Sequence, residues 1–474
     1  MSTKDLSLLS ATELAAGFAS GDLSPVDATE AALAAIERYD PQVNAMVLVD
    51  ADAAREQAKD SEQRWRTGAP LGPADGVPTT IKDLLLTRGW PTLRGSTLIS
   101  ADGPWTEDAP AVARLREAGC VLLGKNATPE FGWKGVTDSI RHGATGNPWN
   151  PGLTSGGSSG GAATAVGLGM STWSVGTDGG GSVRIPAAFT GTVALKGTYG
   201  LVPLYPASPY GTLSHVGPMA RTVTDAALML DLLARRDSRD WSALPPPGAS
   251  FTDGLDGGVR GLRIAFSPTL GFDVPNDPGV EAAVRAAVDV LADAGARVEE
   301  VDPGISDPVE AFHVLWFTGA AKVLEAYGEG AVEKVDPALR EAVERHGLSV
   351  SASDYLDATA VRVDLGRRMG AFHEEYDVLV TPTMPIPAFT IGQPGPDGWP
   401  GRRWTSWTPY TYPFNMTQQP ALSVPCGFTS GGRPVGLQVV GPRHADALVL
   451  RVGHAYQTRT SWHEQVPTLL RDRD

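Results

Sequence analysis

Apolar positions over residues 1–70 recur every three to four places, a spacing that predicts helices rather than strands. Three helices are expected here. The first begins at a capping box on Ser10, the second begins at Ser24 with proline in its first position, and the third ends at Gly68. We expect this helical arm to pack on the outside of the segments that follow it.

From residue 77 to about residue 236, short apolar runs alternate with helical patterns. This alternation predicts an α/β fold with a large mixed, mainly parallel β-sheet that is covered by helices on both faces. The strand candidates are residues 77–85, 120–126 and 172–178, and the helix candidates are residues 108–119 and 158–169.

A break rich in proline and glycine covers residues 238–258 and is followed by a strand–helix–strand pattern. We expect one domain over residues 1–474, built from four parts. They are the helical arm (1–70), a core (71–236), a smaller inserted or appended α/β region (about 259–375), and C-terminal strands with a closing helix (376–474).

The composition restricts the function classes. The 474 residues carry a formal net charge of −15, so the basic surface that nucleic-acid binding needs is not expected. The two cysteines, Cys120 and Cys426, have apolar or small neighbours and are interpreted as buried hydrophobic residues. The N-terminal residues lack the pattern of a signal peptide, and no apolar run is long enough to span a membrane. We therefore expect a cytoplasmic protein, either a monomer or a homodimer.

Two serines stand in separate glycine-rich turns, Ser158 in GGSSGG and Ser182 in DGGGS. A hydroxyl beside exposed backbone N–H groups is the arrangement of a nucleophile and its oxyanion hole. The first turn also fits G-x-S-x-G, the nucleophile elbow of Ser-His-Asp esterases. That alternative requires a preceding strand and a late histidine. A proline-punctuated loop precedes the turn instead, and the late histidines lie in terminal segments typical of surface or packing residues.

A lysine could act as the base if it is neutral. An exposed lysine has a pKa of about 10.4, so burial must bring it to about 7 to make it useful at neutral pH. Lys82 ends the apolar run GVPTTIK and is followed by Asp83 and three leucines, which makes it the preferred candidate. Lys125 and Lys196 have similar surroundings and remain rivals, and a solvated lysine at a strand end is the alternative for each.

Taken together, Lys82 in GVPTTIKD, Ser158 in GGSSGG and Ser182 in DGGGSVRIP resemble the amidase signature family. The 24-residue step between the two serines is also the family's spacing. Further blocks resemble the family between about residues 5 and 465, among them GKNATPEFG, SHVGPMARTVTDAALML and YDVLVTPTMP.

The resemblance implies an amidase that forms an acyl-enzyme, with esters and carbamates as further candidate substrates. It implies that Ser182 is the nucleophile, Ser158 a proton relay on a cis peptide bond, and Lys82 the neutral base. The backbone N–H groups of four residues would form the oxyanion hole: Gly179, Gly180, Gly181 and Ser182. No metal motif or dinucleotide-binding motif occurs, so no cofactor is expected.

Residues around the nucleophile are expected to support its loop. We interpret Asp178 and Arg184 as a structural ion pair, and Ser159 as hydrogen-bonded within its own turn. Gly179 replaces the aliphatic residue or threonine that the family often has, which would make the loop more flexible. Gly197 replaces a common proline, a change interpreted as structural.

The substrate pocket is expected to be aromatic. Residues 386–414 combine tryptophans with glycines and prolines, which is typical of either a mobile lid or a packed Ω-loop. A bulky or aromatic small-molecule amide or carbamate is the expected substrate. The candidate lining residues are Phe131, Trp133, Trp399, Trp404 and Trp407.

An alternative function uses the same three residues. The glutaminase component of a tRNA-dependent amidotransferase would release ammonia from glutamine and would need partner proteins. SHVGPMARTV and the aromatic loop at residues 399–407 favour the amidase that acts alone.

Overall fold

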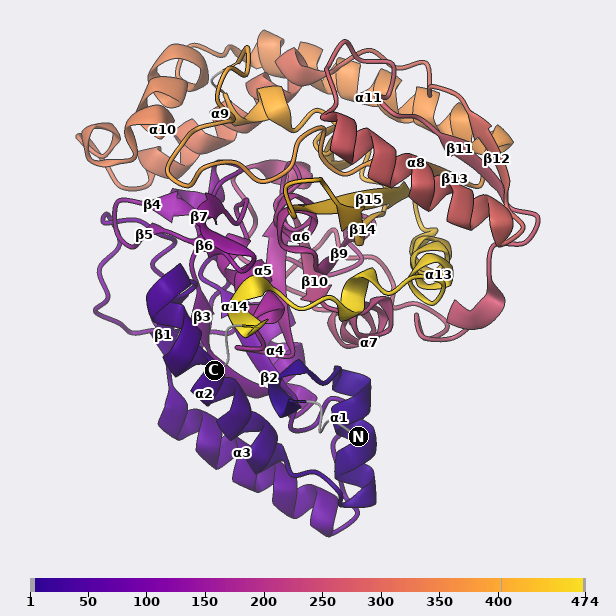
Figure 1. The fold of residues 1–474 in the computed structure, drawn as a ribbon. Coiled ribbons are helices and arrows are strands. Elements are labelled where there is room, and N and C mark those ends of the chain that lie inside the picture. The colour runs from indigo at the N-terminus through magenta and orange to yellow at the C-terminus, as the bar shows by residue number, and fades with distance from the viewer. Residues whose placement is uncertain (1–4, 402, 472–474) are drawn as a thin grey trace.

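The computed structural model describes residues 5–401 and 403–471, and its centre is an 11-stranded sheet (Figure 1). The strand order is β1-β3-β2-β8-β10-β9-β14-β15-β13-β11-β12. Its strands are β1 (Met46–Val49), β2 (Pro78–Lys82), β3 (Val121–Asn126), β8 (Trp173–Asp178), β9 (Val193–Lys196), β10 (His215–Ala220), β11 (Arg263–Phe266), β12 (Arg297–Glu300), β13 (Val378–Pro382), β14 (Ala421–Phe428) and β15 (Pro434–Val440). Two short hairpins lie outside it, β4 (Asp138–Ser139) with β5 (Gly143–Ala144) and β6 (Gly146–Asn147) with β7 (Asn150–Thr154).

The sheet is mixed, as the sequence predicted, but the expectation that it is mainly parallel was wrong. Strand β2 runs parallel to both of its neighbours, β3 and β8, and β11 runs parallel to β12 and β13. In the stretch of the strand order that runs from β8 through β10, β9, β14 and β15 to β13, every pair of neighbouring strands is antiparallel. The parallel pairs enclose crossover helices, whereas β14 and β15 are joined by a short turn that only an antiparallel pair allows.

Helices cover both faces of the sheet, and alternate strand residues point to opposite faces. In β14, Leu422 and Val424 belong to the core beneath α4, α7, α8 and α13, whereas Ala421 belongs to the core beneath α6, α9 and α11. The helices are α1 (Ala11–Ser20), α2 (Pro25–Val43), α3 (Ala51–Arg66), α4 (Pro110–Glu117), α5 (Gly160–Gly167), α6 (Arg184–Thr190), α7 (Val223–Leu233), α8 (Pro278–Asp293), α9 (Val309–Glu325), α10 (Pro337–Ala342), α11 (Ala352–Glu375), α12 (Pro413–Met416), α13 (Asp446–Gln457) and α14 (Thr468–Arg471).

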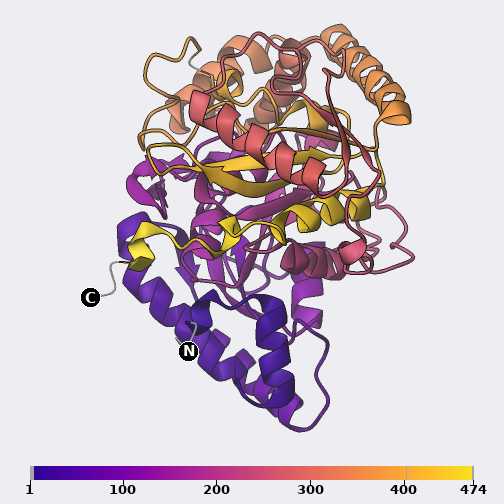
Figure 2. The same cartoon turned by 45° about the vertical axis from the view of Figure 1, so that its right-hand side comes forward.

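The N-terminal segment forms the three helices that the sequence predicted. Helix α1 begins at the capping box of Ser10, and α2 begins with Pro25 after the cap of Ser24. Figures 1 and 2 both show α1–α3 as the lower end of the molecule, away from α8–α11 at the opposite end. The arm also contributes β1, an edge strand that the sequence analysis did not predict, which pairs antiparallel with β3.

The strand–helix–strand unit predicted after the proline- and glycine-rich break is present as β11, α8 and β12. Its two strands extend the central sheet beyond β13 and do not form a separate sheet. Helices α9 and α11 follow, and α9 brings Trp316 toward the carboxyl end of β8, where Gly179 lies.

A fully buried ion pair fastens the turn after β8 to the C-terminal part of the sheet. Arg184, the first residue of α6, donates two hydrogen bonds to Asp178, both of 3.0 Å. Its other three N–H groups go to the carbonyl of Thr411 at 3.0 Å, Oε1 of Gln438 at 2.8 Å and Oδ1 of Asn415 at 2.7 Å. All five guanidinium donors are therefore satisfied inside the protein.

The predicted ion pair of Asp178 with Arg184 is thus present. Burial by itself would raise the pKa of the Asp178 carboxyl, but the charge and hydrogen bonds of Arg184 outweigh it and hold that pKa below its usual value. Asp178 also accepts from Nδ2 of Asn415 at 2.9 Å. A charged pair of this kind is stable in the interior only because each member compensates the other.

Asp178→Asn removes the negative charge and leaves Arg184 charged and buried. We expect the free energy of unfolding to fall by about 3–5 kcal/mol, measured by urea denaturation. The matched control is Glu300→Gln, which breaks a pair with Arg285 in which both side chains are about half exposed; its loss should be below about 1 kcal/mol. Equal losses in the two variants would contradict the compensating role of Asp178.

Candidate active site

The predicted site residues meet where two neighbouring parallel strands end. Lys82 is the last residue of β2, and Asp178 is the last residue of β8. The turn with Ser158 leads into α5, and the turn with Ser182 leads into α6. Because the carboxyl ends of parallel strands lie at one edge of a sheet, β2 and β8 bring residues from distant sequence positions together.

Lys82 is fully buried and contacts hydroxyl groups. Its Nζ lies 2.7 Å from Oγ of Ser158, 2.8 Å from Oγ of Ser159 and 2.9 Å from Oγ1 of Thr177. No carboxylate pairs with Nζ among the described residues. Burial lowers the pKa of Lys82 well below its ordinary value, and the more distant charge of Asp178 only partly opposes the shift.

The two rival lysines are buried as well, but they are engaged elsewhere. Lys125 forms an ion pair of 2.9 Å with Asp83, and its Nζ also donates to Thr92. Lys196 donates to the backbone carbonyl of Gln419. Among the described hydrogen bonds, only the Nζ of Lys82 reaches the hydroxyls of the GGSSGG turn, and this distinction needed the structure.

The turn of Ser158 packs tightly against its surroundings. The peptide bond between Gly157 and Ser158 is cis. A Cβ added at Gly157 would lie 2.5 Å from the backbone carbon of Val136, so a larger residue does not fit. The N–H of Ser159 donates to the carbonyl of Ser182 at 3.0 Å, which joins the two glycine-rich turns directly. Ser159 also donates through its hydroxyl to the carbonyl of Thr177 at 3.2 Å.

The backbone N–H groups around Ser182 differ in their availability. The N–H of Gly181 donates to Oδ1 of Asp178 at 2.7 Å, so it is engaged within the loop. The sequence prediction placed Gly181 among the oxyanion donors, and this bond removes it from that set. The N–H groups of Gly179, Gly180 and Ser182 have no hydrogen-bond acceptor among the described residues.

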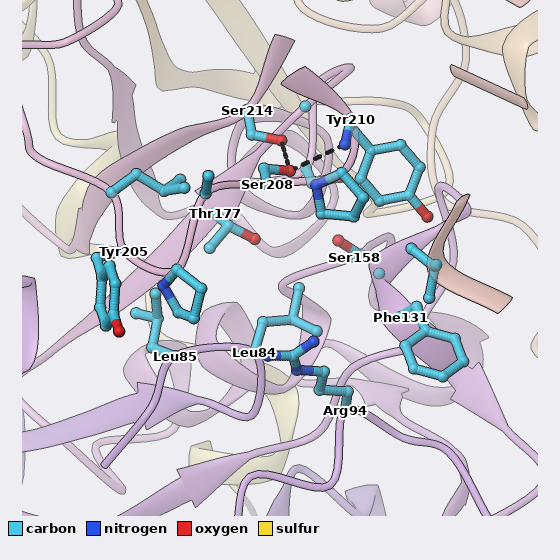
Figure 3. Close-up of a pocket in the computed structure, with 18 of the residues that line it drawn as sticks. Leu84, Leu85, Arg94, Phe131, Ser158, Thr177, Tyr205, Ser208, Tyr210 and Ser214 are labelled. Atoms are coloured by element: carbon cyan, nitrogen blue, oxygen red, sulfur yellow. Dashed lines mark hydrogen bonds between the residues drawn. The ribbon is translucent and has the colours of Figure 1, made fainter. Parts of the chain in front are cut away.

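A cavity of about 140 Å³ opens over both serines. Figure 3 shows Ser158 and Thr177 at its centre, with Tyr210 and Ser208 on one side and Leu84 and Arg94 on the other. The lining residues are Leu84, Leu85, Arg94, Phe131, Gly132, Ser158, Thr177, Gly179, Ser182, Leu204, Tyr205, Pro206, Ala207, Ser208, Pro209, Tyr210, Ser214, Trp316 and Val323.

Of the five aromatic residues predicted to line the pocket, only Phe131 does so. Trp133 is buried, and its backbone carbonyl accepts a hydrogen bond of 3.0 Å from the indole N–H of Trp316 on α9. Trp404 and Trp407 are buried in the core below α9, and Trp399 packs partly buried at its edge. The described residues of 386–414 thus form a packed loop and not a cover over the cavity.

The lining residues that the sequence analysis missed include Arg94, Thr177, Tyr210 and Trp316. Thr177 directly precedes Asp178 and could have been found from that position. Trp316 lies on α9, where an apolar helix face does not reveal which partner it covers. The cluster of prolines and aromatic residues around Tyr210 resembles any surface loop in sequence.

The histidine that an esterase triad would need does not line this cavity. His215 is buried nearby, but its Nδ1 lies 2.8 Å from the carbonyl of Leu213, which holds it against the backbone. Among the described residues, no cluster of three or more His, Cys, Asp or Glu side chains could hold a metal ion. No helix in the described ranges is long and apolar enough to cross a membrane.

Comparison with known proteins agrees with this geometry. The Amidase family model matches residues 27–450. An acylamidase of Rhodococcus erythropolis is 38% identical over 98% of both chains, and a glutamyl-tRNA(Gln) amidotransferase subunit of Chloroflexus aggregans is 38% identical over 98% of this chain and 99% of its own length. The crystal structure of a bacterial aryl acylamidase superposes with a TM-score of 0.89 at 30% identity, covering 96% of this chain and 97% of that one. This chain therefore belongs to the amidase signature family, whose members are hydrolases that act on amide C–N bonds.

Proposed function

We propose that the protein hydrolyses carboxylic amides through an acyl-enzyme on Ser182, with Ser158 as proton relay and Lys82 as base. The observation that carries this proposal is the 2.7 Å contact between a fully buried Lys82 and Ser158, beside a cavity that Ser182 also lines. A buried lysine without a carboxylate partner is poised to be neutral, and only a neutral amine can accept a proton.

The surrounding hydroxyls support this assignment. The hydroxyl hydrogen of Ser159 is directed to the Thr177 carbonyl, so Oγ of Ser159 accepts from Lys82. Oγ1 of Thr177 can accept the second N–H of a neutral amine. The single lone pair of the neutral Lys82 amine then faces the hydroxyl of Ser158, as proton transfer from Ser158 to Lys82 requires.

In the proposed reaction, Lys82 takes the proton of Ser158 as Ser158 takes that of Ser182. Oγ of Ser182 attacks the amide carbon, and the N–H groups of Gly179, Gly180 and Ser182 stabilise the negative oxygen. The relay returns its proton to the leaving nitrogen, the C–N bond breaks, and an ester to Ser182 remains. Water, activated through the same relay, hydrolyses the ester and releases the acid.

An aromatic stack supports a bulky or aromatic substrate. Tyr210, Trp316, Phe312 and Tyr412 stack in series, with ring centroids 4.0, 5.5 and 4.9 Å apart. Tyr210 and Trp316 end the series at the cavity. Flat rings on a cavity wall favour planar or apolar groups. The likeness to an acylamidase and to an aryl acylamidase supports the same substrate class, with esters and carbamates as further candidates.

The alternative, the glutaminase component of an amidotransferase, is supported by the Chloroflexus aggregans relative, whose name is that of a glutamyl-tRNA(Gln) amidotransferase. Glutamine carries an α-ammonium group that needs an anionic or strongly accepting partner. None of the described lining residues is Asp or Glu. This charge pattern favours an amidase of neutral or anionic amides over a glutaminase.

The nucleophile is tested with a fluorophosphonate probe followed by peptide mass spectrometry. We expect the label on Ser182 and its loss in Ser182→Ala. In parallel, the purified protein should hydrolyse an anilide from a panel of anilides, linear amides and carbamates without partners. A label on Ser158 would reverse the two serine roles. Hydrolysis of glutamine and of no other amide, and only when partner proteins are present, would favour the alternative.

The base is tested through the pH dependence of kcat/KM. Because neutral Lys82 is the active form, activity should fall as pH decreases through its pKa. Burial lowers that pKa, so the midpoint should lie well below about 10.4, the value for an exposed lysine. Lys82→Met should abolish turnover, and Lys82→Arg should not restore it, because a guanidinium stays protonated. A midpoint near 10 would contradict a neutral Lys82.

The wall above the oxyanion loop is tested at Gly179. A Cβ there would lie 2.6 Å from Cζ3 of Trp316, so Gly179→Ala should displace the indole or the loop. We expect kcat/KM for a bulky anilide to fall at least about tenfold, equivalent to about 1.4 kcal/mol. Adding Trp316→Phe should recover part of the loss. The control, Gly366→Ala on α11, meets no atom within 4 Å and should leave kcat/KM unchanged.

A further inference from the structure

Arg94 is the only Lys, Arg, Asp or Glu among the described residues that line the cavity. Its guanidinium has no hydrogen-bond or ion-pair partner among the described residues. The neighbouring carboxylate of Asp83 pairs through Oδ1 with Lys125 at 2.9 Å, which offsets its charge, and its buried Oδ2 makes no hydrogen bond to Arg94 or to any other described residue. The carboxylate of Glu130 accepts instead from the hydroxyl of Ser96 at 2.6 Å and from the N–H of Asp336 at 2.7 Å. The cavity therefore presents a positive charge that the protein itself leaves unmatched.

The backbone of Arg94 is held on both sides. Its φ of 54° lies in the left-handed region, which side-chain-bearing residues rarely adopt. Its N–H donates to the carbonyl of Asp83 at 3.1 Å, and its own carbonyl accepts from the N–H of Phe131 at 2.8 Å. These bonds fix the position of the Arg94 backbone from which the side chain extends. Figure 3 shows the guanidinium beside Leu84, on the side of the cavity away from Ser208 and Tyr210.

The surroundings of this charge are largely apolar. Leu84, Phe131, Trp316 and Val323 line the same cavity. An unpaired guanidinium next to apolar side chains keeps some solvent when the cavity is empty, and Arg94 is indeed partly exposed. A ligand that displaces this solvent must supply compensating negative charge, or the cation is left desolvated.

We propose that Arg94 binds a carboxylate carried by the substrate at a distance from the scissile bond. This inference rests on the proposed function and narrows its substrate class to amides with an apolar body and an anionic end. A guanidinium suits this task because its planar N–H groups match both carboxylate oxygens. The same charge disfavours cationic amides, since no lining carboxylate among the described residues offsets it.

The test compares substrates that differ in one carboxylate. Glutaryl-4-nitroanilide is matched with hexanoyl-4-nitroanilide, and 4-acetamidobenzoate with 4-acetamidotoluene, because the carboxylate can lie on the acyl or the amine side. In at least one pair we expect higher kcat/KM for the anionic member. Arg94→Gln should reduce the ratio of kcat/KM for the anionic member to kcat/KM for the neutral member about tenfold to a hundredfold, as expected for a lost charged hydrogen bond. The loss should be mainly in KM, and Arg94→Lys should recover part of the ratio.

The control is Arg88→Gln in the same connecting segment, where the Arg88 side chain is about two-thirds exposed and lies 3.9 Å from the carboxylate of Asp108. Its anionic-to-neutral ratio should equal that of the wild type. Thermal unfolding and circular dichroism verify that the Arg94 variants fold. No preference in either pair, or a preference that survives Arg94→Gln, overturns the inference.

The two proposals fail separately. If the wild-type protein labels on Ser182 and hydrolyses neutral and anionic anilides equally, the role of Arg94 is wrong and the proposed function stands. If Ser182 does not label and no amide in either pair is hydrolysed, the proposed function itself is wrong.

Discussion

The buried ion pair between Asp178 and Arg184 is the interaction on which the arrangement of the site depends. It joins the end of β8 and the start of α6 to α12 and β15, so the turn that carries Ser182 is held by two elements from the C-terminal part of the chain. It also affects Lys82. The negative charge of Asp178 favours a protonated lysine, and Arg184 offsets that charge at close range. The same contact thus shapes the loop and limits the effect of Asp178 on the pKa of Lys82.

Much of the fold followed from local signals in the sequence. Ser10 and Ser24 mark helix starts because a capping hydroxyl satisfies backbone N–H groups whatever the tertiary surroundings. Strand direction was harder to predict, since β8, β10 and β9 look alike as short apolar runs, and pairing depends on contacts between distant segments. The antiparallel centre of the sheet was missed for this reason.

The candidate site shows the same contrast between local sequence signals and contacts that depend on distant segments. Lys82, Ser158 and Ser182 could be predicted from their motifs, but the choice among three buried lysines required their contacts. The aromatic wall was assigned to Trp404 and Trp407 because their segment looked like a lid, whereas burial places both in the core. Trp316 and Arg94 were missed because the sequence around each residue does not show that tertiary packing places it at the cavity.

The central sheet also bears on how the chain assembles during synthesis. Strand β9 pairs with β14, and Arg184 bonds with Asn415, which is 231 residues further along the chain. Until the ribosome has made β14 and β15, the first half carries an open strand edge and a guanidinium without its full set of acceptors. Such edges invite pairing with other chains. Because closing long loops is slow, this strand edge stays open until late in the synthesis of the chain.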